Sequence, residues 1–313
     1  MEKATATLIL EEMPPYIDKD GLWKKVITEL FEPFVLFFAP DLYPKLDWYK
    51  EPDSLEQEFH RVFPVKKGTK YTDKLMKVHL KNGEERWMLI HIEVQGYEDN
   101  DFAMRMFQYF YRIFDKYHKK IYAIALFADE HPYYKPDTYA YQFHGTELNY
   151  KYNTYKILDQ DEQKLLLSDN PFAYAVLAGL YMLKSRDNAS ERYQFKRRLF
   201  ELLLKGKKIK DREYVDSLLY FIDYLLEVPS GMKEELQEEV KPMMEEEASH
   251  MAGTGFPNSP TFKPIFDEFK EEAKKENSKE IALEMLREEF KAKDIVKVTG
   301  LTEQELEDIK TKL

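Results

Sequence analysis

The sequence predicts a mixed α/β protein whose second half is wholly helical. Segments 86–95 and 121–127 have the length and apolar composition of buried strands. Segment 100–117, which lies between them, has its apolar residues at the spacing of an amphipathic helix. A strand, a helix and a second strand in this order form a crossover unit, which favours parallel pairing of the two strands. From about residue 160 onward, the apolar spacing is helical only.

The N-terminal part is expected to begin with two helices. Residues 19–39 have apolar side chains three and four positions apart, and Pro40 then ends the pattern. A shorter helix is expected over Ser54–Val62, where Ser54 can cap the first turn.

A hairpin is expected next, because residues 81–84, Lys-Asn-Gly-Glu, supply the turn that joins segments 71–80 and 86–95. The helix over 100–117 and the strand over 121–127 follow it. A further strand is expected near Leu148–Ile157. These elements together form a sheet with helices beside it.

The remainder of the chain is expected to consist of helices near 170–185, 190–205 and 211–227, and then of a linker and a helical tail. The Gly/Pro/Ser-rich stretch 251–260 is the expected linker. Thr302 and Glu305 form a capping-box pattern just after Gly300, which separates two short helices. The sequence thus predicts an α/β core over 1–160, a helical region over 161–250, and a linker and tail over 251–313.

Composition narrows the class of protein. Cysteine is absent, which excludes disulfides, thiolate metal sites and cysteine nucleophiles. The longest apolar run is too short to cross a membrane and the N-terminus lacks a signal-peptide plan, so we expect a cytoplasmic, soluble protein. The net charge is −11, but residues 61–128 hold 13 Lys and Arg against 8 Asp and Glu, a balance of +5. This local basicity is compatible with a DNA-binding surface.

Two carboxylates mark a candidate metal site. Glu93 and Gln95 share one face of the second hairpin strand, whereas the alternate residues are wholly apolar. A carboxylate in so apolar a strand is costly unless it is paired or metal-bound. Asp73 lies in the partner strand, and two neighbouring acids suit Mg²⁺. The sequence alone does not fix the register, and the same pattern also fits acids that stay hydrated at a strand end.

Three segments of the sequence resemble a known family. They are Thr72–Val78 (TDKLMKV), Ile90–Gly96 (IHIEVQG) and Phe102–Phe114 (FAMRMFQYFYRIF), with support from residues 38–42 and 294–303. In this order and spacing they are similar to the recombination-promoting nuclease/transposase family of the PD-(D/E)XK superfamily. The likeness covers roughly residues 20–160 and the last thirty, and is weaker over 170–250.

The resemblance implies a restriction-endonuclease-like mixed sheet flanked by helices and a Mg²⁺-dependent DNA endonuclease linked to recombination or mobile DNA. Asp73 matches the metal-binding Asp and Glu93 the second acid, and the backbone carbonyl of Val94 matches a further metal ligand. Gln95 stands where the superfamily usually has Lys, and Thr72 stands where Pro is common. Gln95 has no charge, but it can hydrogen-bond the attacking water.

DNA contacts are expected from Arg105, Tyr109 and Lys77. Arg105 and Tyr109 lie four residues apart on one helix face, where they either meet a phosphate or brace the sheet. Lys77 either follows a DNA backbone or only solubilises the hairpin. The acidic helical tail is expected to have a structural or oligomerisation role rather than to read DNA. Two other functions stay open: a weakened relative that binds DNA or protein without cutting, and a helical interaction protein.

Overall fold

The computed structural model describes residues 19–55, 72–81, 88–206, 208–248 and 258–311. Two compact units divide the chain, Met1–Pro229 and Ser230–Leu313. The finer boundaries expected at residues 160 and 250 stay a prediction. No helix of the described residues is both long and apolar enough to cross a membrane.

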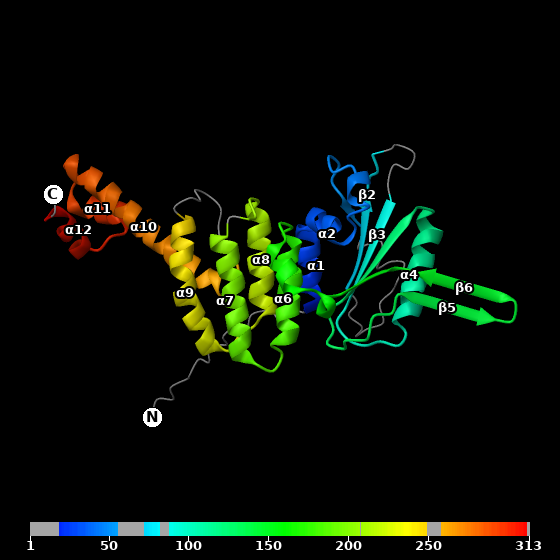
Figure 1. Ribbon diagram of the computed structural model, residues 1–313. Coiled ribbons are helices and arrows are strands. Elements are labelled where there is room, and N and C mark those ends of the chain that lie inside the picture. The colour runs from blue at the N-terminus through cyan, green and yellow to red at the C-terminus, as the bar shows by residue number, and fades with distance from the viewer. Residues whose placement is uncertain (1–18, 56–71, 82–87, 207, 249–257, 312–313) are drawn as a thin grey trace, which may run out of the picture. The chain divides into compact units, whose positions relative to one another are not determined.

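A five-stranded sheet forms the centre of the first unit, with the strand order β1-β2-β3-β4-β7 (Figure 1). Pairing is antiparallel from β1 to β3 and parallel from β3 to β7. The predicted hairpin, the crossover unit and the mixed α/β class are therefore confirmed. The strands are β1 (Asp53–Ser54), β2 (Thr72–Val78), β3 (Met88–Gln95), β4 (Ile121–Phe127) and β7 (Asn153–Lys156).

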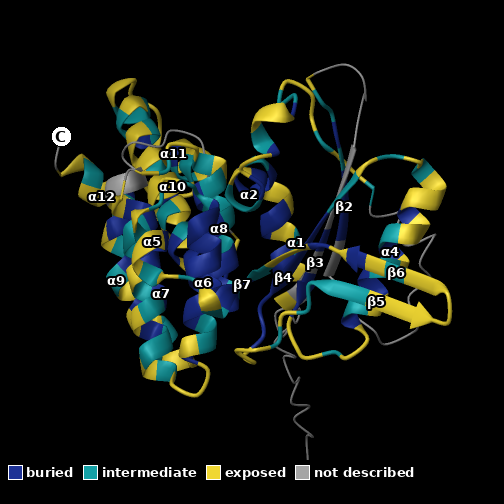
Figure 2. Cartoon of the chain, turned by 45° about the vertical axis from the view of Figure 1, so that its right-hand side comes forward, coloured by how far each residue is buried: buried dark blue, intermediate teal, exposed yellow. Residues whose placement is uncertain are grey.

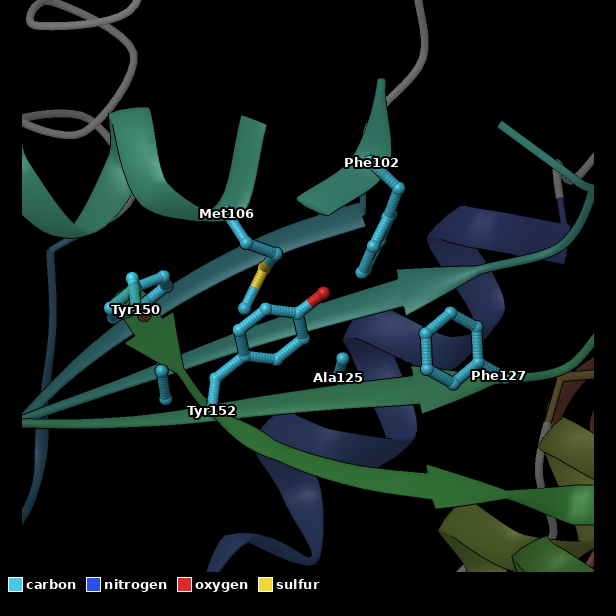
Figure 3. Packing of buried hydrophobic residues seen from close by; sticks show 7 residues of the cluster. Phe102, Met106, Ala125, Phe127, Tyr150 and Tyr152 are labelled. Atoms are coloured by element: carbon cyan, nitrogen blue, oxygen red, sulfur yellow. The ribbon is translucent and has the colours of Figure 1, made fainter. Parts of the chain in front are cut away.

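Helices cover both faces of this sheet. On one face, α4 (Phe102–Tyr117) packs Phe102 and Met106 against Ala125 and Phe127 of β4 (Figure 3). The other face is apolar along β3 and β4, and α1 (Lys19–Glu29) lies on that side (Figure 3). Burial on both faces explains why β4 is an almost unbroken apolar run.

The helix expected over residues 19–39 is two helices, α1 and α2 (Phe31–Phe38), with the break at Leu30. Pro33 explains the break, because its ring conflicts with the carbonyl of the residue four positions earlier, Glu29, which is where α1 ends. Proline is tolerated in the first turn of the new helix, where its missing N–H is not needed.

The region before β2 departs from the prediction at Ser54, which belongs to the short edge strand β1. Ser54 pairs with Met76 of β2. The rest of the expected helix, 56–62, lies outside the described residues. Two short 3₁₀ turns also occur in this unit, η1 (Tyr43–Lys45) and η2 (Ile157–Asp159).

The strand expected over 148–157 is divided between two sheets. Residues up to Lys151 belong to β6 (Thr146–Lys151), which pairs only with β5 (Thr138–Phe143) in a two-stranded ribbon. After Tyr152, whose N–H donates to the Asp137 carbonyl at the base of the ribbon, β7 joins the main sheet. The ribbon itself was not expected from the sequence.

Four helices complete the first unit, and three of them match the predicted helices near 170–185, 190–205 and 211–227. Trp23 of α1 packs edge-on against Phe221 of α8, 4.9 Å between ring centroids. A Cβ at Gly179 of α6 would lie 3.0 Å from the Trp23 ring, so a larger residue there would require the ring to shift by a few tenths of an ångström. α6 is buried on nearly every side (Figure 2). The helices are α5 (Glu162–Leu167), α6 (Phe172–Lys184), α7 (Ala189–Lys205) and α8 (Arg212–Leu225).

The carboxyl of Asp216 on α8 gives the stability of this unit a pH dependence. Burial raises the pKa of Asp216 from 3.8 to about 6, although Arg212 opposes the shift. The folded state therefore binds a proton that the unfolded state has lost, and stability falls as pH rises from 3.8 to about 6. We expect Asp216→Asn to raise the free energy of unfolding at neutral pH by roughly 1–2 kcal/mol.

The gain from Asp216→Asn should disappear below pH 3.8, where both states are protonated. Thermal unfolding of both proteins across this pH range measures it. Asp187→Asn, an exposed position, is the matched control. An equal gain at all pH values would show that the carboxyl charge is not the cause.

The second unit is helical, as predicted for the tail. The capping box is confirmed, because the Thr302 hydroxyl accepts from the Glu305 N–H and the Glu305 carboxylate accepts from the Thr302 N–H. Gly300 has φ of 71° and ends α11 in the left-handed conformation. Most of the expected linker, its residues 251–257, lies outside the described residues. The helices are α9 (Ser230–Ala248), α10 (Phe262–Arg287), α11 (Ala292–Thr299) and α12 (Glu303–Lys310).

Candidate functional site

The register of the β2–β3 hairpin places Asp73 directly opposite Glu93. Directly opposite residues of an antiparallel pair lie on the same face of the sheet. This is the arrangement that the sequence allowed without fixing it. The face is the one that α4 covers, since Leu75, two positions after Asp73, packs against Tyr109 and Ile113 of that helix.

Backbone hydrogen bonds define this pair further. The Leu75 carbonyl accepts from Leu55 N–H, so Leu75 turns its backbone groups toward β1. The Gln95 carbonyl accepts from Ala128 N–H, so Gln95 turns its groups toward the β4 side. Backbone groups of residues two positions apart in a strand point the same way. The N–H and C=O groups of Asp73 therefore point toward β1 and those of Glu93 toward β4, away from each other. They form a non-hydrogen-bonded pair, the type in which opposite residues approach most closely, with Cα atoms about 4.5 Å apart.

Gln95 is held rigidly on the same face. Its side chain is buried, with 2% of its surface exposed. Its amide nitrogen donates to the Tyr97 carbonyl at 2.6 Å, and its amide oxygen accepts from Arg105 Nη2 at 3.0 Å. These two bonds fix which end of the amide faces which neighbour.

Arg105 joins Gln95 to the loop after β3. Its Nη1 pairs with the Asp99 carboxylate, and its guanidinium lies over the Phe102 ring, 5.2 Å from the centroid. The Tyr134 hydroxyl donates to the Asp99 carbonyl at 2.8 Å, and burial raises the pKa of Tyr134 to about 12, so it stays a donor at neutral pH. The loop is thereby attached to both α4 and the segment after β4.

The three residues expected to contact DNA lie in different surroundings. Arg105 and Tyr109 are both buried on the side of α4 that faces the sheet, 9% and 6% exposed. This is the bracing position that the sequence left open beside DNA contact. Lys77 is half-buried and its Nζ lies 2.8 Å from Asp53 Oδ2 across the β1–β2 pair. Their roles toward DNA stay predictions.

Val94 lies between the two functional positions of β3, and its side chain is buried on the α1 side. Since backbone directions alternate, its carbonyl turns away from β4 and toward β2, the strand that contains Asp73. The candidate set therefore comprises two carboxylates on opposing strands and a carbonyl that points toward the space between those strands. All three donors are oxygen atoms, which are the ligands Mg²⁺ prefers.

The donor set fits Mg²⁺ by its chemistry and by its placement on the backbone. The side chains of Asp73 and Glu93 lie outside the described part of the chain. Among the side chains that are described, no group of three His, Asp or Glu could hold a metal ion.

Sequence analysis missed a buried ion pair at the same edge of the sheet. Lys156, the last residue of β7, places Nζ 2.7 Å from Asp129 Oδ1, and both side chains are 1% exposed. The same Oδ1 accepts from the His131 N–H. The sequence contained a signal for this pair, because Asp129 is a carboxylate just after the apolar strand β4, as Glu93 is a carboxylate near the end of β3. Charged residues beyond a strand are usually solvated, however, and the pairing needs the tertiary fold.

A hollow of about 620 Å³ opens beside the end of β3. Val94, Gly96 and Tyr97 line it on the strand side, and Arg186 and Arg192 lie on its helical wall. Arg186 pairs with Glu130, and Arg192 donates to the carbonyls of Ser185, Arg186 and Glu227. The hollow lies on the α1 side of the sheet, opposite the face that Asp73 and Glu93 share, and has both basic and acidic groups around it.

A comparison with family models decides which family the chain falls in. The model described as "Putative transposase, YhgA-like" matches residues 68–235, more than half of the chain. The chain belongs to this family. Neither the curated proteins nor the solved structures contain a match to the chain.

The match to the YhgA-like family includes every residue of the candidate site and the helices α5 to α8. It confirms the resemblance seen in the sequence. The coarse prediction of a function linked to mobile DNA agrees with the family's description. The nuclease chemistry, the metal and the role of each residue belong to the proposal that follows.

Proposed function

We propose that this chain is a Mg²⁺-dependent DNA endonuclease, with a restriction-endonuclease-like core, that acts in recombination or on mobile DNA. The observation that supports it most is the close, non-hydrogen-bonded pairing of Asp73 with Glu93. Two like charges directly opposite each other destabilise a sheet. A bound cation removes this penalty, so the arrangement favours a metal site over a structural role.

Each residue has a distinct part in the proposed reaction. Asp73, Glu93 and the Val94 carbonyl would hold Mg²⁺, which when bound supplies Lewis-acid polarisation of the scissile phosphate. Gln95 shares the face of Glu93, and its amide would orient the attacking water by a hydrogen bond. Arg105 acts as a positioning residue, because it fixes the Gln95 amide and is too buried to reach far into solvent.

The direct test is cleavage of supercoiled plasmid by the full chain. We expect nicked and linear product with Mg²⁺ and none with excess EDTA, because the carboxylates alone provide no electrophile for the phosphate. If Mg²⁺ produces no cleavage while a gel shift still shows DNA binding, the chain is the binding module that is the alternative function. Gln95, which lacks the charge of Lys, is the feature that favours this alternative.

The positioning role of Arg105 gives a second expectation. Arg105→Lys keeps the charge but loses the planar guanidinium that reaches both Gln95 and Asp99. We expect kcat for plasmid cleavage to fall about ten- to a hundredfold, as misplacement of a catalytic group does, with KM little changed. Arg198→Lys is the matched control, since Arg198 of α7 pairs with Glu162 of α5. A rise in KM at constant kcat would instead indicate direct contact of Arg105 with DNA.

A further inference from the structure

The outer side of α4 is an exposed aromatic stripe. Tyr111 and Phe114 are 56% and 47% exposed, although the opposite side of the same helix is buried against the sheet. Among the described residues, twelve large hydrophobic side chains are exposed, and five of them belong to α4 and the neighbouring strand β5. The five are Met104, Tyr111, Phe114, Tyr141 and Phe143. Such concentration on one surface marks an interaction site rather than scattered exposure.

Ring contacts connect α4 with the β5–β6 ribbon. Phe107 stacks on Tyr139 of β5 at 5.3 Å with an interplanar angle of 15°, and it also stacks on Tyr111 at 6.4 Å. A second series of ring contacts runs from Tyr150 of β6 through Phe110 to Phe114. The exposed rings on α4 are therefore the outer members of two rigid series whose inner members are partly or fully buried.

The ribbon extends the same surface. Tyr139, Tyr141 and Phe143 alternate with other residues along β5, so they share the face that Tyr139 turns toward α4. The ribbon reaches beyond α4 (Figure 1), and its outer half is exposed (Figure 2). Tyr141 and Phe143 are accordingly 46% and 63% exposed, while Tyr150 at the base is buried. We call Tyr111, Phe114, Tyr141 and Phe143 the aromatic platform.

Positive charge lies beside the aromatic platform. Residues 108–120 contain four basic residues against one acidic residue, a balance of +3 in a chain whose net charge is −11. Arg112, Lys116 and Lys120 are exposed on the C-terminal half of α4 and just after it. The ribbon from 138 to 151 contains one Lys and one Glu and is neutral. Arg112 and Lys116 follow Tyr109 by three and seven positions, so on α4 the cations lie beside the rings and not between them.

We propose that the aromatic platform binds single-stranded DNA by base stacking, with Arg112, Lys116 and Lys120 contacting the phosphates. Aromatic rings stack on bases only when the bases are unpaired, and cations beside the rings attract the backbone. The inference rests on the proposed function only for the choice of DNA as partner. It adds a second DNA contact, on a surface separate from the Asp73–Glu93 pair.

Charge complementarity favours DNA over a second copy of the chain. Pairing of two copies through this surface would bring together two segments 108–120, each with a balance of +3, whereas a polyanion neutralises that charge. A duplex fits less well, because its base faces are already stacked and the ribbon has no net positive charge for the backbone. A single strand offers both bases and phosphates to the same surface.

The test measures fluorescence anisotropy of a labelled oligothymidylate of about 16 nucleotides with the full chain in EDTA, so that no cleavage occurs. We expect Tyr111→Ala/Phe114→Ala and Tyr141→Ala/Phe143→Ala each to weaken binding about tenfold or more, given the stacking of one or two bases. Arg112→Gln/Lys116→Gln should reduce the slope of log K against log salt by about 0.7 for each cation removed. All of these side chains are exposed, so circular dichroism should show an unchanged fold.

Tyr49→Ala/Lys50→Gln is the matched control, because Tyr49 is fully exposed next to a cation on another surface. Unchanged affinity in both aromatic variants would overturn the proposal. So would tighter binding of an RNA oligomer of equal length, or the loss of a dimer in sedimentation with DNA binding intact. The anisotropy assay contains no metal. Failure of plasmid cleavage would therefore overturn the proposed nuclease function without affecting the measured affinity for the oligonucleotide.

Discussion

Replacing Asp73 by Asn or Glu93 by Gln is expected to reduce Mg²⁺-dependent plasmid cleavage about a thousandfold. Each change removes one carboxylate charge while keeping the size of the side chain. Transition-state stabilisation by a bound metal amounts to several kcal/mol, and about 4 kcal/mol corresponds to this factor. The rate of nicking at saturating Mg²⁺ measures it. Asp169→Asn, at an exposed position in the same unit, is the matched control.

The double variant Asp73→Asn/Glu93→Gln distinguishes a shared metal site from two independent effects. Residues that act as one unit are strongly non-additive, so the double variant should lose little more activity than either single variant. If the two residues had separate roles, the fold losses in cleavage rate of the single variants would multiply in the double variant. Wild-type rates in both single variants would remove the metal site and leave the binding-only alternative.

A readout without DNA follows from the same register. Two opposing carboxylates repel each other in the absence of metal, so each single variant should unfold at a higher temperature than the wild type in EDTA. Mg²⁺ should raise the melting temperature of the wild type, because a ligand that binds only the folded state stabilises it. The variants should respond weakly. If addition of Mg²⁺ did not change the melting temperature of the wild type, this would contradict the proposed site even if cleavage were seen.

Local patterns were sufficient to predict much of the fold. The strand over Ile121–Phe127 and the helix before it follow from apolar spacing, and the parallel pairing follows from their order. The capping box at Thr302 and the stop at Gly300 are signals between near neighbours in sequence. Pro33 also held the information for the break between α1 and α2, although the apolar spacing on both sides concealed it.

Features that depend on contacts between distant segments could not be predicted. The pairing of Asp73 with Glu93 depends on register, and a shift by one residue would move one of the two acids to the opposite face. The hydrogen bond from Arg105 to Gln95 forms only if α4 packs over β3 at one particular position along the strand. The aromatic residues Tyr139, Tyr141 and Phe143 alternate along β5, but this alternation does not reveal that the strand pairs with β6 outside the main sheet.

Lys196→Met is expected to lower the free energy of unfolding of the first unit by about 3–5 kcal/mol. Lys196 on α7 places Nζ 2.6 Å from Asp223 Oδ1 on α8, and the side chains are 3% and 0% exposed. The ammonium also donates to the Asp223 carbonyl at 2.9 Å. Lys196→Met removes the counter-charge that Lys196 supplies to this buried carboxylate. Urea unfolding followed by circular dichroism measures the loss.

The partner substitution identifies the cause of that loss. Lys196→Met/Asp223→Asn removes both charges and keeps hydrogen-bonding groups at position 223, so it should recover most of the stability. Lys205→Met, nine residues further along α7, removes an exposed pair with Glu201 and should cost at most about 1 kcal/mol. Cavity formation alone would leave the double variant as unstable as Lys196→Met. Recovery would show that the uncompensated charge is responsible, since the volume lost at position 196 is the same in both variants.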